Sequence, residues 1–163
     1  MASLPIFLKT LHILMATVFF GTGMGVAFVK VRADHTGDVR IIAWANRFVV
    51  QADLLFTIPS GVLMPVTGLA LAWQYWPSWG TFWAMVWATP WLLKALVGWA
   101  VAGAFWLPAW RLQYRMHALA AAALAEGSPL PEAYHRYTRW WMLLGFPSFT
   151  AAMWTFWVMV SKG

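Results

Sequence analysis

The chain has 163 residues, of which 62% are hydrophobic and 10% are charged, and 14 of them are tryptophan. A soluble domain carries about 25% charged residues, so this composition excludes a soluble enzyme, a disordered chain and a coiled coil, and it indicates an integral membrane protein. Cysteine is absent, which excludes disulfides, a cysteine nucleophile and cysteine-ligated zinc or iron–sulfur centres.

Four apolar segments are long enough to cross a bilayer, since its hydrocarbon core needs about 20 helical residues. We predict these spans at residues 4–29, 48–73, 82–106 and 140–160. An Ala-rich stretch at residues 107–126, stopped by Gly127, predicts a helical extension on the cytoplasmic side. The sequence therefore predicts an all-α integral membrane protein, a four-transmembrane-helix bundle that forms a single domain over residues 1–163.

The chain has a net charge of +6, and its basic residues gather in particular connections between the spans, a pattern that indicates membrane topology. We therefore expect no nucleic-acid partner. The first and third connections between spans hold most of the basic residues: Lys30, Arg32, Arg40, Arg47, Arg111, Arg115, Arg136 and Arg139. The middle connection, residues 74–81, has no charge, and only Lys9 and Lys162 lie toward the opposite side. The positive-inside rule then predicts both basic connections in the cytoplasm and both termini outside, in the periplasm.

The first predicted span carries a histidine well inside the membrane. His12, Ala16 and Gly23 fall on one side of this helix at a period of 3.6 residues. A neutral imidazole is a common axial ligand of haem iron. Ala16 and Gly23 leave room for the edge of a macrocycle, and Phe19 could stack on it. We therefore predict His12 as a haem ligand, and the alternative is a structural histidine held by hydrogen bonds.

The opposite side of the same helix carries a GxxxG pair, Gly21 and Gly25. Such pairs let two helices approach closely. We expect this pair to be a seat for helix packing. The partner helix could belong to a second copy in a homodimer, or to a larger membrane complex of which this chain is an accessory subunit.

The second and third spans each contain one charged residue, and such residues are functional candidates because a charge in the membrane is costly. We predict that Asp53 and Lys94 lie at a similar depth, either as a structural ion pair or as catalytic residues that carry protons or contact a cofactor. Lys94 could instead satisfy a carbonyl group freed by Pro90. Met64 lies on the inward stripe of the second span near the level of His12, as a second axial ligand or as ordinary packing.

The other three histidines, His35, His117 and His135, fall in the predicted cytoplasmic connections. They cannot reach His12 across the membrane, so a haem with two histidine ligands built on His12 is not expected. His117 and His135 could together hold a metal ion or a second porphyrin. The favoured interpretation is that they are ordinary surface histidines.

Three short motifs resemble a known family of small bacterial four-helix membrane proteins. They are Leu8-Lys9-Thr10-Leu11-His12-Ile13, Pro65-Val66-Thr67-Gly68-Leu69-Ala70 and Leu92-Leu93-Lys94, one in each of the first three spans. The resemblance is to predicted integral membrane proteins of unknown function and covers nearly the whole chain. More distantly, the chain is similar to the haem-associated protoporphyrinogen oxidases and to the CopD-like membrane domains. In the oxidases a first-helix histidine ligates haem b and a third-helix lysine is needed for activity, which implies these roles for His12 and Lys94.

Together these features predict a protein of the bacterial inner membrane that binds haem b and takes part in electron transfer or porphyrin redox chemistry. Any enzymatic activity is expected to be that of an oxidoreductase, with the haem iron supplying the redox chemistry. Two alternatives remain open. One is a small transporter of copper or another metal ion, linked to protons through Asp53 and Lys94. The other is the accessory subunit.

Overall fold

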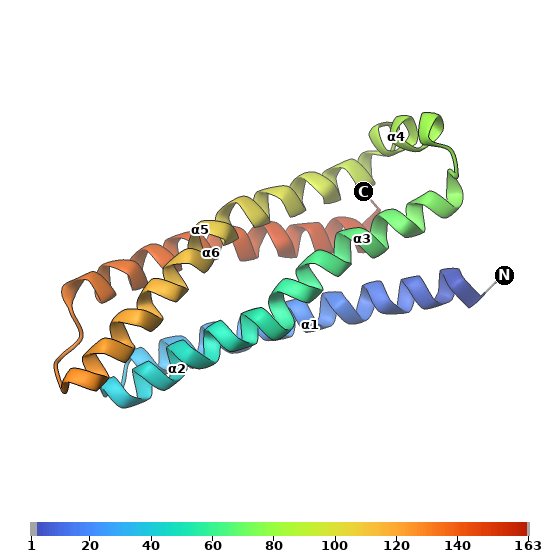
Figure 1. Cartoon of the computed structure of the whole chain (residues 1–163). Helices are drawn as coiled ribbons and strands as arrows, with labels where there is room; N and C mark the ends of the chain where they lie inside the picture. Colours follow the sequence, from blue (N-terminus) through green and yellow to red (C-terminus); the bar gives the residue numbers. More distant parts are fainter. Residues whose placement is uncertain (1–2, 163) are drawn as a thin grey trace.

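The computed structural model describes residues 3–162, and these residues form helices without any strand (Figure 1). The elements are α1 (Ser3–Asp34), α2 (Val39–Ala52), the π-helical turn η1 (Asp53–Thr57), α3 (Ile58–Tyr75), α4 (Trp79–Ala88), α5 (Pro90–Glu126) and α6 (Glu132–Ser161). The prediction of an all-α protein is therefore confirmed.

Four helical runs are long and apolar enough to cross a membrane: α1, the continuous run Val39–Tyr75, α5 and α6. The shortest of them has 30 residues, which at about 1.5 Å per residue exceeds a hydrocarbon core of about 30 Å. The helices thus extend beyond the apolar layer, and α5 continues as one helix through residues 107–126. Four spans make this chain an integral membrane protein.

The two ends of the bundle carry different connections. Both chain ends and α4 lie at one end, which we call the terminal end (Figure 1). The opposite end, which we call the loop end, holds the α1–α2 and α5–α6 connections. At the loop end Gly127 adopts a left-handed conformation with φ 63° and ends α5. Asp38 begins α2, because its side chain accepts a hydrogen bond from the backbone N–H of Arg40 at 2.8 Å.

The third predicted span differs from the structure at its start. We expected one helix over residues 82–106, but the chain breaks at Thr89, which is extended, and α5 begins at Pro90. Proline has no N–H and fixes its φ, so it suits the first turn of a helix and disrupts a helix interior. The residues before the break form α4, whose Phe82 and Val86 pack with Ala72 and Leu92 at the terminal end.

Helix pairs build the bundle. The most extensive contact joins α5 and α6, followed by α1 with α3 and α2 with α5. Gly98 allows the close approach of α5 and α6, because a Cβ there would overlap Thr155 and the ring of Trp154. The GxxxG pair, Gly21 and Gly25, makes no close helix contact within the described chain. A Cβ at Gly21 or Gly25 would meet nothing within 4 Å in the described chain, so these glycines seat no helix of the same chain.

A buried polar cluster ties three helices together at the loop end, and we call it the Tyr134 network. Lys30 of α1 donates to the Tyr134 hydroxyl at 2.7 Å, and Asn46 of α2 donates to the same oxygen at 2.8 Å. The hydroxyl in turn donates to Asp34 at 2.6 Å, and Asp34 also pairs with Lys30. Lys30 and Tyr134 are each only 1% exposed. The sequence does not reveal this cluster, because Lys30 falls among the basic residues that indicate topology.

Candidate functional site

The imidazole of His12 on α1 is held by α3. Its Nδ1 lies 2.9 Å from the backbone oxygen of Met64 and 3.0 Å from the hydroxyl oxygen of Thr67. A carbonyl oxygen only accepts hydrogen bonds, so Nδ1 must carry the proton and donate it. In the neutral ring the lone pair then belongs to Nε2. This contact also confirms that Met64 lies at the depth of His12.

The Thr67 hydroxyl acts as an acceptor toward the same ring. It donates its own hydrogen to the backbone oxygen of Leu63 at 2.7 Å, which leaves its lone pairs facing His12. The shared donation to Thr67 and Met64 fixes both the tautomer and the orientation of the imidazole. Such a carbonyl partner on the second ring nitrogen is the usual support of a metal-ligating histidine.

Gly68 of α3 also lies against the His12 ring. A Cβ at this position would lie 3.2 Å from Cε1 of His12. This separation is shorter than normal van der Waals contact between carbon atoms. A side chain at position 68 would therefore press on the imidazole and require it to shift by a few tenths of an ångström, and the glycine of the PVTGLA motif avoids this contact.

We expect Gly68→Val to push the His12 ring away from the Met64 carbonyl. In the wild-type protein, ¹⁵N NMR of labelled histidine should show His12 protonated at Nδ1 and unprotonated at Nε2, and in Gly68→Val this signature should be lost. Gly145→Val is the control, because a Cβ at Gly145 meets nothing within 4 Å. A wild-type ring protonated at Nε2 instead would contradict the assigned tautomer.

The other ligand candidates on α1 extend from His12 toward the middle of the membrane. Ala16 and Gly23 are partly exposed, and a Cβ at Gly23 would meet nothing within 4 Å. The ring of Phe19 packs against Trp99 of α5, with 5.0 Å between ring centroids, and it lies beside Gly61 of α3. Phe19 is thus already part of the contact between helices.

A cavity of about 220 Å³ lies beside Phe19, and we call it the central cavity. Its lining comes from α1, η1, α3, α5 and α6 and includes Thr57, Gly61, Trp99 and Ser148. Gly61 precedes Met64 by about one helical turn, so the cavity begins roughly 5 Å deeper than the seat of His12. The face of α1 that carries His12 therefore leads into an apolar space with few polar groups.

The predicted pairing of Asp53 with Lys94 is wrong. Among residues 3–162 the ion pairs are Lys30 with Asp34 and Arg40 with Asp38. Asp53 is 2% exposed and faces α5 at Gln113, whereas Lys94 is exposed. Gln113 follows Lys94 by 19 residues on the same helix, a separation of about 28 Å.

Lys94 lies instead near the depth of His12. Its neighbours Leu92 and Leu96 join one apolar cluster with Leu69, the residue that follows Gly68. Asp53 precedes Met64 by 11 residues in the run that continues from α2 into α3, which places it about 16 Å away from the His12 seat. The two charged candidates thus belong to different levels of the bundle.

Comparison with known proteins supplies the family. The family model described as predicted integral membrane protein (DUF2269) matches residues 6–163. The chain belongs to the DUF2269 family. No curated protein and no solved structure matches it. The resemblance to a family of predicted integral membrane proteins is therefore confirmed, and the comparisons do not extend it to haem-associated oxidases or CopD-like domains.

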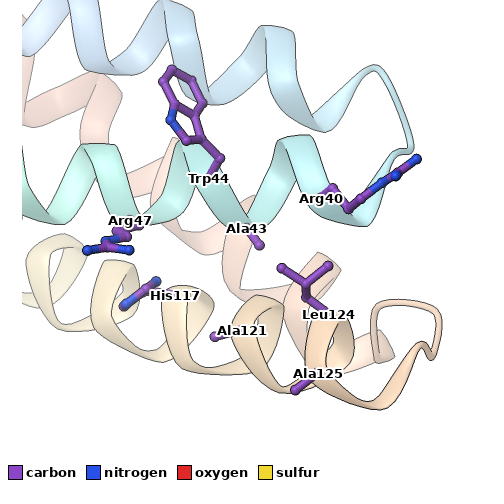
Figure 2. A pocket seen from close by; sticks show the side chains of 8 residues that line it. All are labelled: Arg40, Ala43, Trp44, Arg47, His117, Ala121, Leu124 and Ala125. Carbon is purple, nitrogen blue, oxygen red and sulfur yellow. The ribbon is translucent and has the colours of Figure 1, made fainter.

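The remaining histidines of this DUF2269 protein lie toward the loop end. His35 is exposed, and its Nδ1 lies 2.7 Å from the backbone oxygen of Val31. His135 is exposed on α6 beside the ring of Tyr134. His117 points from α5 toward α2 and Arg47 (Figure 2). Within residues 3–162 no group of three or more His, Cys, Asp or Glu side chains could hold a metal ion.

Proposed function

We propose that this DUF2269 protein is a b-type haem protein of the bacterial inner membrane, with His12 as an axial ligand of the iron. One observation carries the proposal. The His12 ring donates through Nδ1 to the Met64 carbonyl at 2.9 Å, which leaves Nε2 with the lone pair that a metal requires. Histidine held in this way is a frequent axial ligand of haem.

The donor set favours haem over a metal ion held by the protein alone. Zinc and copper sites take three or four protein ligands, whereas haem brings four nitrogen ligands and needs only axial ones from the protein. Within residues 3–162, His12 belongs to no group of three or more His, Cys, Asp or Glu side chains that could hold a metal ion. A single imidazole inside a membrane bundle therefore suits a porphyrin iron.

The candidate residues differ in their relation to this proposed site. Met64 enters through its carbonyl oxygen, because that oxygen lies on the Nδ1 side of the ring, away from an iron at Nε2. Ala16 and Gly23 keep the face of α1 free of bulk. Lys9 and Lys94 lie near the depth of His12 and are available to the haem carboxylates. Asp53 lies outside this site.

When bound, the haem supplies one-electron chemistry, and the chain sets its environment. The Met64 carbonyl increases the basicity of His12 through the Nδ1 hydrogen bond. His12 is half-buried, and its position within a membrane-spanning helix keeps bulk water from the ring. Electron transfer or porphyrin redox chemistry is the class of reaction that these roles support, with Lys94 as the catalytic cation implied by the resemblance to the oxidases.

Haem binding can be measured through the protein's own tryptophans. Haem added to the purified protein should quench the fluorescence of its 14 tryptophans in a saturable manner. His12→Ala should lose the saturable phase, because the iron loses its axial nitrogen. His35→Ala is a matched control, since His35 makes the same Nδ1–carbonyl contact in an exposed position. Equal saturable quenching in His12→Ala and the wild type would refute the proposed ligand.

A further inference from the structure

Four buried polar side-chain atoms have no hydrogen-bond partner among the described residues. They are Asp53 Oδ2, Trp110 Nε1, Gln113 Oε1 and His117 Nδ1. The last three share one face of α5, at the spacing of three and four residues that places side chains together. The fourth belongs to η1, which faces that helix at Gln113. Since most buried polar groups are satisfied, this concentration at one interface calls for a physical reason.

Asp53 and Gln113 each keep an unsatisfied acceptor oxygen within one contact. Asp53 is 2% exposed and Gln113 is 5% exposed. The Thr57 hydroxyl donates to Asp53 Oδ1 at 2.7 Å, so Oδ1 is satisfied while Oδ2 is not. Gln113 Oε1 also lacks a donor. The Gln113 amide nitrogen can donate to an ionised Asp53. A hydrogen on Oδ2 would instead make Asp53 the donor, and with the amide turned over the Gln113 oxygen is the acceptor that receives it.

No cation on a neighbouring helix balances Asp53 within the described part of the chain. On α1, Lys30 is engaged with Asp34 and Tyr134. Arg47 of α2 and His117 of α5 line a separate cavity, and Arg111 and Arg115 of α5 are exposed and form no ion pair with Asp53. The π-helical turn itself and α3 offer hydroxyl groups and, at the far end of α3, Tyr75. An unpaired carboxylate inside a membrane costs several kcal/mol, and protonation removes that cost.

We propose that Asp53 is a proton-binding site, with the proton held between Asp53 Oδ2 and Gln113 Oε1. The site lies between two cavities. On one side Thr57 lines the central cavity. On the other, His117 follows Gln113 by one turn and lines a cavity of about 430 Å³ between α2 and α5 at the loop end, together with Arg47, Ala43 and Leu124 (Figure 2).

The backbone at Asp53 departs from α-helical geometry, which supports a functional role for this residue. The chain forms a π-helical turn over Asp53–Thr57 between two α-helices, and such turns occur frequently at functional sites. His117, Gln113, Asp53 and Thr57 thus form a polar line from the loop-end cavity to the central cavity. This line gives the Asp53 proton a path of exchange with the loop end. The proposal does not depend on haem.

Infrared spectroscopy of the purified protein in lipid nanodiscs tests the site. At neutral pH the wild type should show the carbonyl band of a protonated carboxylic acid, and Asp53→Asn should lose it. Asp38→Asn is the matched control, because the Arg40 N–H lowers the pKa of the exposed Asp38 and keeps it ionised. A wild type without the band, or a band that survives in Asp53→Asn, would overturn the proposal. A band removed by adding Na⁺ or K⁺ would also overturn it and identify a cation site.

A second variant distinguishes loss of the proton-binding group from loss of the fold as the cause of a missing acid band. Gln113→Leu keeps the carboxyl group and removes its acceptor, so the acid band should remain and shift to higher frequency. An unshifted band would show that Gln113 does not share the proton. Transfer to D₂O should move the band as the proton exchanges, and His117→Leu should slow this exchange. An unchanged exchange rate would overturn the path through His117.

Discussion

Tyr134→Phe should lower the free energy of unfolding by about 3 kcal/mol, since each buried polar group left without its partner costs about 1–3 kcal/mol and charged groups cost more. The lost hydroxyl accepts from Lys30 and Asn46 and donates to Asp34. Lys30 is 1% exposed and Asn46 is 2% exposed, so water cannot readily replace the missing contacts. Unfolding in mixed detergent micelles, followed by circular dichroism, measures the difference.

Tyr137→Phe is the matched control for this prediction. The substitution is the same, one helical turn further along α6, and the Tyr137 hydroxyl makes no hydrogen bond to the described residues, while its ring packs against the apolar core. We expect a change of about 0.5 kcal/mol or less there, as for substitutions that remove no buried contact. If both variants unfold alike, the Tyr134 network does not stabilise the loop end as described.

Gly98→Val should disrupt the contact between α5 and α6. A Cβ at Gly98 would overlap the Thr155 hydroxyl and lie 2.8 Å from ring atoms of Trp154. Overpacking of this kind typically costs about 1–3 kcal/mol, and the two branches of valine place this position at the upper end. A lower midpoint of thermal unfolding and a larger fraction of aggregated protein after detergent extraction are expected.

The control for this variant lies on the same helix. Gly103→Val makes the same change where a Cβ would meet nothing within 4 Å. Its unfolding midpoint should stay near the wild-type value, because valine there requires no movement of α6. Equal destabilisation by both variants would mean that helix propensity, and not the close approach at Gly98, determines the loss.

The four long apolar helices and the level of His12 relative to Met64 could be predicted from sequence, because hydropathy and helical periodicity are local properties. His12 and Met64 are 52 positions apart and in contact. Their common level could be predicted because counting residues along two antiparallel helices gives the relative depth of each side chain. The Tyr134 network was not accessible in this way. Lys30 and Tyr134 are 104 positions apart, and nothing local marks Lys30 as buried.

The error over Lys94 has one physical cause. The predicted third span begins at residue 82, but α5 begins at Pro90, which moves Lys94 toward the terminal end by about 12 Å at 1.5 Å per residue. Proline at the first turn of a helix is a signal present in the sequence. With the helix start at Pro90, the same count separates Lys94 from Asp53 and brings it near the depth of His12.

The visible absorption spectrum of the haem-supplemented, detergent-purified protein tests the haem proposal most directly. The oxidised and dithionite-reduced wild type should show a Soret band and, on reduction, a sharp α-band, and His12→Ala should lose both. A wild-type spectrum that contains only tryptophan absorption after haem supplementation would contradict the proposal that His12 ligates haem.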